Sequence, residues 1–178
     1  MRRFAGRLVV TSPLILCGVL VAVSACEDPG QAIEAENRRI VSEIIREAWN
    51  EGNLEVFPEL FASDFVYRDP AAPTVTDLDS YRAFVSGILT RWPERSLTID
   101  DMISENDKVV VKYEFRGVRS EVGTEEEPGT EATVSHPGIQ IYRLFEGKVV
   151  ELDDIWDALG AYQQAGYELV LREGQDGQ

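Results

Sequence analysis

The chain has 178 residues and a formal net charge of −15, with 32 acidic and 17 basic side chains. Such an acidic surface repels phosphate backbones, so the composition excludes nucleic acid as a partner. The single histidine, His136, leaves no Cys/His cluster that could hold zinc, so we expect no metal site.

The first 25 residues are typical of a targeting segment. Arg2, Arg3 and Arg7 precede an almost wholly apolar stretch over residues 8–21, and V-S-A-C at 23–26 resembles a bacterial lipobox. We expect residues 1–25 to be a cleaved lipoprotein signal and Cys26 to carry a lipid that anchors the protein to a membrane of the bacterial cell envelope, on its extracytoplasmic side. An uncleaved anchor and an ordinary signal peptide ending in Ala-Cys are the alternatives.

A polar tether over residues 26–31 is predicted to lead into one domain over residues 32–167. Apolar residues recur at helical spacing between 32 and 50, which predicts an amphipathic helix; they are Ile33, Ile40, Ile44, Ile45 and Trp49. Gly52 is a natural C-terminal cap, and Asn53 can cap a second short helix over 54–61, with Phe57 and Leu60 facing inward.

Residues 64–69 are predicted to form the first strand, in which Tyr67 and Asp69 share one face before Pro70 stops the pairing. Asp69 could cap the following loop through backbone hydrogen bonds. Asp77 is expected to cap a helix that ends near Leu89 and covers the concave side of a sheet.

Two further strands are predicted over residues 96–103 and 108–118, joined by a turn at 105–107. In the second, Val109, Val111, Tyr113 and Phe115 share one face and charged residues share the other, so one face of the sheet is wet. The acidic stretch 121–130 is expected to be a loop, which either covers a pocket or has no role there.

The last third of the domain predicts a strand that ends near residue 144, a tight turn at Gly147, a second strand over 149–156 and a helix over 158–167. The tail, 168–178, is expected to be flexible. If Val150 and Leu152 face the core, alternation places Asp154 and Trp156 on the same face.

Three polar side chains of the preceding strand share one parity. His136, Gln140 and Tyr142 would all point inward, unless a bulge at Pro137-Gly138 turns His136 to the other face.

A carboxylate such as Asp154 is costly to bury unless it is hydrogen-bonded, neutralised or used. Burial raises the pKa of a carboxyl group and makes it a better proton acceptor from carbon. The alternative is that Asp154 only caps a segment or pairs with an arginine at the sheet edge.

The motifs I-Y-R at 141–143, E-G-K-V-V at 146–150, D-D-I-W-D at 153–157 and Q-Q-A-G at 163–166 resemble the SnoaL-like polyketide and ester cyclases. These enzymes belong to the nuclear transport factor 2-like superfamily. The segments W-N-E-G-N-L-E at 49–55 and F-A-S-D-F-V-Y at 61–67 resemble the opening of the same superfamily.

The resemblance implies an α+β fold, in which a curved antiparallel sheet is wrapped by N-terminal helices into a cone. It implies that Asp154 is the general acid/base of an intramolecular aldol closure, and that Asp69 lines the cavity mouth. Gln140 occupies the position of a histidine that the family places in the same pocket. A homodimer formed through the outer sheet face is a further implication.

Two functions of different classes follow. In the first, the protein is a cyclase, isomerase or hydrolase that needs no cofactor and acts on a small apolar carbonyl compound. Asp154 would then move a proton, while Tyr67, Gln140 or His136 would stabilise the enolate, in a pocket lined also by Tyr113, Tyr142 and Trp156. In the second, the same cone binds a small apolar or aromatic ligand without turnover.

Overall fold

The computed structural model describes residues 29–120, 131–168 and 170. The signal segment, Cys26, the 121–130 loop and most of the 168–178 tail lie outside the described residues. What we predicted for them therefore stays a prediction.

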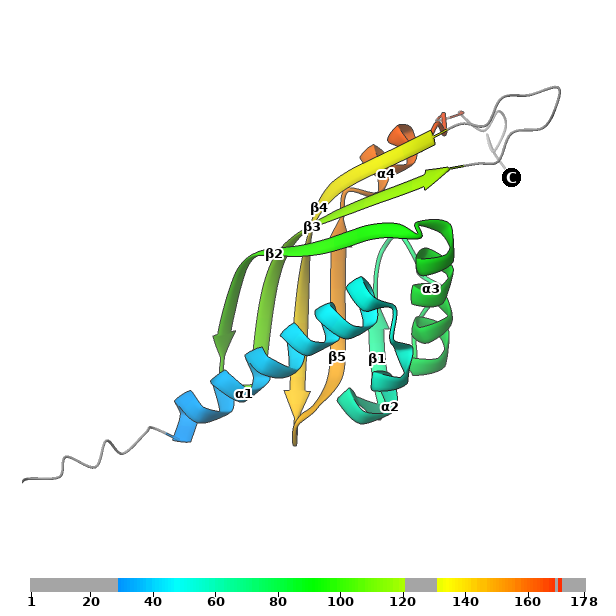
Figure 1. Ribbon diagram of the computed structural model, residues 1–178. Coiled ribbons are helices and arrows are strands. Elements are labelled where there is room, and N and C mark those ends of the chain that lie inside the picture. Colours follow the sequence, from blue (N-terminus) through cyan, green and yellow to red (C-terminus); the bar gives the residue numbers. More distant parts are fainter. Residues whose placement is uncertain (1–28, 121–130, 169, 171–178) are drawn as a thin grey trace, which may run out of the picture.

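A five-stranded sheet, ordered β1-β5-β4-β3-β2, forms the body of the domain. Figure 1 shows that the sheet is strongly curved. Its strands are β1 (Phe61–Arg68), β2 (Glu94–Glu105), β3 (Lys108–Ser120), β4 (Glu131–Phe145) and β5 (Lys148–Trp156). The expected antiparallel pairing holds from β2 to β5, whereas β1 joins the edge in parallel with β5.

Helices cover the concave side of this sheet (Figure 1). They are α1 (Pro29–Ile44), which continues as a π-helical segment (Ile45–Glu51), a 3₁₀ turn (Leu54–Val56), α2 (Phe57–Leu60) and α3 (Leu78–Arg91). The last helix, α4 (Ala158–Gln164), lies beside the far end of β4 (Figure 1). Side chains of α1, α3 and the inner sheet face belong to one hydrophobic core. Within the described residues, no helix is both long and apolar enough to cross a bilayer.

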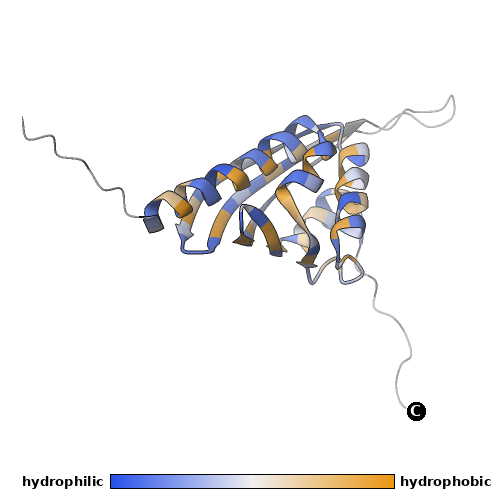
Figure 2. Ribbon diagram, turned by 90° about the horizontal axis from the view of Figure 1, so that it is seen from below, coloured by the Kyte–Doolittle hydropathy of each residue, from blue (hydrophilic) through white to orange (hydrophobic). Residues whose placement is uncertain are grey.

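The first helix is amphipathic, and Figure 2 shows hydrophilic and hydrophobic residues alternating along it. Ile40, Ile44 and Ile45 are buried as predicted, but Ile33 is 57% exposed because the first turns project beyond the sheet (Figure 1). The helix begins at Pro29, three residues before the predicted start. Proline favours the first helical turn because the N–H that it lacks would have no partner there.

Aromatic rings fill the core between α2, α3 and β1. Tyr81 stacks on Phe57 at a centroid distance of 5.5 Å and packs against Phe61, Phe65 and Tyr67. Offset and tilted ring pairs of this kind add to the apolar area that they bury. This cluster packs α3 against β1. Tyr67 lies near the end of β1, and Asp69 follows directly after it.

The β4–β5 hairpin turns at Glu146 and Gly147, which both have positive φ angles, 49° and 78°. Two such residues in succession are typical of the tight turns that match the twist of a hairpin. A bulge between Arg143 and Leu144 shifts the register, so that Leu144 pairs with Val149. Val149, rather than the predicted Val150, is therefore fully buried, and the alternation from Leu152 to Asp154 is preserved.

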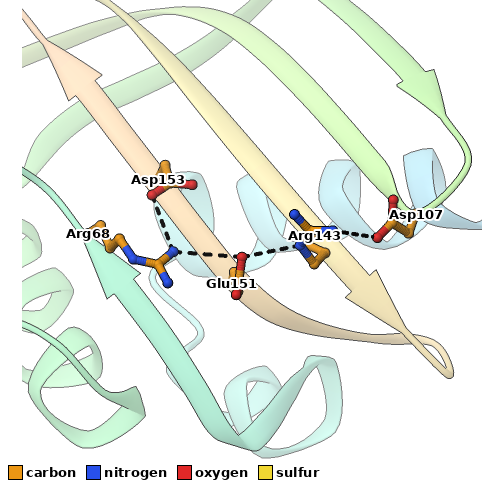
Figure 3. A network of polar contacts seen from close by, with 5 residues as sticks. All are labelled: Arg68, Asp107, Arg143, Glu151 and Asp153. Carbon is orange, nitrogen blue, oxygen red and sulfur yellow. Dashed lines mark hydrogen bonds and ion pairs between the residues drawn. The ribbon is translucent and has the colours of Figure 1, made fainter.

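Charged side chains tie the strands together on the outer sheet face (Figure 3). Arg143 binds Glu151 at 3.1 Å and Asp107 at 2.8 Å, while Arg68 lies 3.4 Å from Asp153 and 3.7 Å from Glu151. Arg143, which belongs to the I-Y-R motif, therefore holds the hairpin from outside and does not reach the core. Exposed Ile139, Ile141 and Ile155 lie on the same face.

Candidate functional site

A cavity of about 370 Å³ lies between the inner sheet face, α3 and α4. Its walls are mainly aromatic and aliphatic, and the side chains come from elements that are far apart in the sequence. The lining residues are Trp49, Ala71, Ala72, Ala83, Phe84, Gly87, Ile88, Arg91, Trp92, Leu97, Tyr113, Phe115, Val134, His136, Asp154, Trp156, Ala161, Tyr162, Ala165 and Tyr167.

Asp154 is the acidic group of this cavity. It points inward from β5, as predicted, and is only 4% exposed. Its Oδ1 accepts a hydrogen bond from the Tyr113 hydroxyl at 3.0 Å, and its Oδ2 accepts one from Gln140 Nε2 at 2.9 Å. Both partners are neutral, so the alternative of an arginine pair at the sheet edge is wrong.

Burial raises the pKa of Asp154 to about 7, against the lowering effect of the hydrogen bonds from Gln140 and Tyr113. The charge of nearby Asp69 raises this pKa further. A carboxyl group with a pKa near neutrality can both accept and return a proton at physiological pH.

Gln140 and Tyr142 form a chain behind Asp154. Gln140 is opposite Asp154 in the β4–β5 ladder, and its Oε1 accepts a hydrogen bond of 2.6 Å from the Tyr142 hydroxyl. Both side chains are 0% exposed, and neither lines the cavity. The chain fixes the orientation of the Gln140 amide, so that its N–H₂ group faces the carboxylate. Gln140 thus holds Asp154 from behind.

Gly138 lets Tyr113 reach Asp154. Tyr113 on β3 pairs with Gly138 on β4, and a Cβ at Gly138 would lie 2.3 Å from the Tyr113 hydroxyl oxygen. The Tyr113 ring therefore crosses β4 over the space that a side chain would fill, and its hydroxyl arrives at a carboxylate on β5. Nothing in the linear sequence connects these three positions.

Asp69 is a second buried carboxylate beside the first, and it is 4% exposed. It accepts hydrogen bonds from the Ala71 N–H at 2.7 Å, the Tyr67 hydroxyl at 3.2 Å and Trp156 Nε1 at 3.0 Å. The loop-capping interpretation is therefore confirmed, and Asp69 also holds two side chains of the site. Tyr67 and Asp69 do not line the cavity, contrary to the prediction, because Trp156 and residues 71–72 lie in front of them.

His136 points into the cavity. The β3–β4 ladder runs without a bulge from residue 131 to residue 143, so the predicted inward parity is kept. The imidazole lies between Phe115 and Trp156, at centroid distances of 5.2 and 4.7 Å. Burial lowers its pKa, so the ring is neutral at pH 7 and carries a single N–H. Nδ1 lies 3.4 Å from the Pro137 carbonyl oxygen, so the tautomer with its hydrogen on Nε2 is the one that can donate to a ligand.

Several lining residues were not found from the sequence. Trp49, Phe84 and Ile88 were assigned to helical apolar faces, and only the packing of these helices against the sheet shows that they also border a cavity. Tyr162, on α4, had no pattern that could have identified it. Among the residues that the structure describes, no group of three or more metal-binding side chains comes together.

Comparisons with known proteins identify a domain family and a shared fold. Residues 41–152 match the SnoaL-like domain. A candidate polyketide cyclase from Acidithiobacillus ferrooxidans has 24% identity and a TM-score of 0.63, covering 74% of this chain and 95% of its own. A candidate SnoaL-like polyketide cyclase from Jannaschia sp. has 20% identity and a TM-score of 0.64, covering 80% and 98%.

A third structure, an epoxide hydrolase from M. tuberculosis, has 11% identity and a TM-score of 0.56, covering 74% of this chain and 90% of its own. No curated protein is significantly similar in sequence. Together, the solved structures confirm the predicted fold class, a cone of the nuclear transport factor 2-like type.

Proposed function

The chain belongs to the SnoaL-like domain family, and on that premise we propose that it catalyses proton transfer on a small apolar carbonyl compound held in the cavity. The reaction is of the cyclase or isomerase type. The observation that carries the proposal is a carboxyl group that lines an apolar cavity, is 4% exposed, and has a pKa of about 7.

In this reaction the Asp154 carboxylate takes a proton from the carbon next to the ligand's carbonyl group. The resulting enolate carbon then attacks a second carbonyl of the same molecule, and Asp154 returns the proton to the new alkoxide oxygen. Proton transfer by a positioned side chain contributes about 10²- to 10⁴-fold to a rate. The neutral donors Tyr113 and Gln140 favour this cycle, because they hold the carboxylate without locking it in the charged form.

The enolate oxygen needs a hydrogen-bond donor where water is excluded. Of the three donors predicted from the sequence, His136 borders the cavity, whereas Gln140 and Tyr67 lie behind Asp154 and Asp69. Tyr113 borders it as well. We therefore assign the oxyanion role to His136 in its Nε2–H tautomer. Gln140 and Tyr113, which both donate to the carboxylate, have the role of positioning Asp154. No organic cofactor or metal takes part in this scheme.

The proposal is tested by deuterium exchange into the methyl group of acetylnaphthalene, an aromatic ketone, followed by NMR in D₂O. The wild type is expected to accelerate exchange, and Asp154→Asn to lose at least about a hundredfold of that acceleration. Asp153→Asn is the matched control, because the neighbouring carboxylate lies on the outer face beside Arg68. Equal exchange rates for the wild type and Asp154→Asn would overturn the proposal.

The second candidate is a binding module without turnover, favoured by the largely aromatic cavity wall. It predicts that acetylnaphthalene binds to the wild type and to Asp154→Asn alike, with no exchange above background. We further propose that the protein acts at the cell envelope, anchored through Cys26. The support for this location is the sequence pattern of residues 1–26.

A further inference from the structure

The cavity has few charged side chains, and they differ in how deeply they are buried. Among the described lining residues, Asp154 is the one acid and Arg91 the one permanently charged base, with His136 neutral. Asp154 is buried, whereas Arg91 is exposed. Arg91 therefore belongs to the solvent-exposed rim of the cavity, and Asp154 belongs to its buried part.

Arg91 has no partner among the contacts of the described residues. Several other arginines are paired: Arg82 binds Glu55, and Arg143 binds Glu151 and Asp107. Among the residues described, Arg38 is unpaired like Arg91, but it does not line the cavity. Arg91 ends α3, where a cation also interacts favourably with the helix dipole. That interaction accounts for a basic residue in the last turn, but it does not require the side chain to border a cavity.

Arg91 is the one permanently charged cation in the described lining, and so the group there that attracts an anion. The chain carries a net charge of −15, so its overall field repels anions. A guanidinium group at the mouth offers a planar set of donors that suits carboxylate, sulfonate or phosphate oxygens. Beyond it, the walls from Phe84 and Ile88 to Trp156 accept only apolar or aromatic groups.

We propose that Arg91 is a specificity-determining residue, which selects ligands that have an apolar body and an anionic group at the end facing solvent. This inference deepens the proposed function, since it rests on the ligand's carbonyl lying at Asp154 and adds an anionic group at the opposite end. An uncharged ligand of the same shape would bind more weakly, because it forms no ion pair with Arg91.

Two fluorescent probes test the proposal through binding alone. Anilinonaphthalene sulfonate and N-phenylnaphthylamine have the same aromatic body and differ in the sulfonate group. The wild type is expected to bind the sulfonate about tenfold more tightly than the neutral probe. Arg91→Gln should remove that preference by weakening the sulfonate alone, and Arg91→Lys should retain part of it.

Arg38→Gln is the matched control, because Arg38 is also exposed and unpaired within the described part of the chain but lies on α1, away from the cavity. It should leave both affinities within about twofold of the wild type. Gly87→Phe shows where the probes bind. A Cβ at this lining position meets nothing within 4 Å, so the ring can enter the cavity and should weaken both probes.

Equal affinity of the wild type for the two probes would overturn the proposal, as would failure to bind either of them. A sulfonate preference that survives in Arg91→Gln, or binding that is unaffected by Gly87→Phe, would also overturn it. These outcomes leave the deuterium-exchange result for Asp154 unchanged, so failure of the specificity and failure of the catalytic role are distinguishable.

Discussion

At the scale of single residues, the site is a buried acid held by neutral donors. Asp154 accepts from Tyr113 and Gln140, and Gln140 is fixed in turn by Tyr142. None of these partners brings a positive charge that would offset the desolvation of the carboxylate. The pKa of Asp154 is therefore higher in the folded protein than in the unfolded chain.

The raised pKa of Asp154 makes the stability of the protein depend on pH. The folded pKa of about 7 lies above the reference value of 3.8, so the folded state binds more protons, and the free energy of unfolding falls as pH rises from about 4 to about 7. Asp154→Asn removes this pH dependence, so its stability relative to the wild type should rise between pH 5 and pH 9, by at most on the order of 4 kcal/mol. Urea unfolding at pH 5 and pH 9 measures the difference, which should be larger at pH 9.

The matched control for this experiment is Asp153→Asn, whose carboxylate is on the outer face and should show no such trend. An Asp154→Asn variant whose stability relative to the wild type does not rise between pH 5 and pH 9 would contradict the assignment of a costly buried charge.

Gly138 is the residue on which the geometry of Tyr113 depends. A methyl group here would overlap the Tyr113 ring, with its nearest ring carbon at 2.2 Å. Gly138→Ala is expected to cost about 1–3 kcal/mol of stability and to displace the Tyr113 hydroxyl from Asp154. NMR titration of the Asp154 carboxyl carbon should then give a higher pKa than in the wild type, since a hydrogen bond that lowers it is lost.

Gly160→Ala would not serve as the control, because its Cβ would meet the Asp157 carboxylate. Gly87→Ala is suitable, since that position is open: it should leave the Asp154 titration close to the wild type and raise the stability by up to about 1 kcal/mol, because Gly87 lies within helix α3.

At the scale of elements, two side-chain amides join helices to strands by binding both the backbone N–H and the carbonyl of one residue. Asn50 accepts from the Leu97 N–H at 2.7 Å and donates to the Leu97 carbonyl at 3.1 Å, which fixes β2 against the end of the first helix. Gln164 does the same for Ser135, at 2.7 and 2.9 Å, and fixes α4 against β4. Two walls of the cavity are therefore set by these contacts.

The β4–β5 turn carries a conformational cost that a substitution can remove. Glu146 has a φ of 49°, a region that asparagine tolerates better than glutamate does, and Asn-Gly is the favoured pair in such turns. Glu146→Asn is expected to stabilise the protein by roughly 1 kcal/mol, measured by urea unfolding. Glu146→Gln removes the same charge without this conformational benefit, so equal effects of the two would refute the explanation.

At the scale of the whole molecule, the prediction that remains is the lipid anchor. If Cys26 is the lipidated first residue of the mature protein, Cys26→Ser should move the protein from the membrane fraction to the soluble fraction of bacterial cells. Mass spectrometry of the wild type should find an acylated N-terminal cysteine at position 26. An unmodified Cys26 in a membrane-bound protein would favour the uncleaved anchor instead.

The exposed isoleucines Ile139, Ile141 and Ile155 lie on the outer sheet face, where a homodimer was expected. That assembly stays a prediction.

The sequence by itself determined the fold class, the inward direction of Asp154 and the caps at Gly52 and Asn53. These features depend on local periods and on glycine or asparagine chemistry, which are written in consecutive residues. The hairpin motif also identified the family. Alternation predicted the wrong inward-facing residue at Val150, where a bulge adds one residue to β5. The register there is decided by strand pairing, which the alternation of residues along one strand does not show.

The tertiary structure alone decided which side chains meet at the cavity. Tyr113 reaches Asp154 across a glycine of the intervening strand, Trp156 covers Asp69, and Arg91 comes to the mouth because α3 packs over the sheet. Each of these contacts joins elements that are distant in sequence, and it depends on sheet curvature and on helix packing. Periodicity places a side chain on a face, but only the closed fold determines what that face encloses.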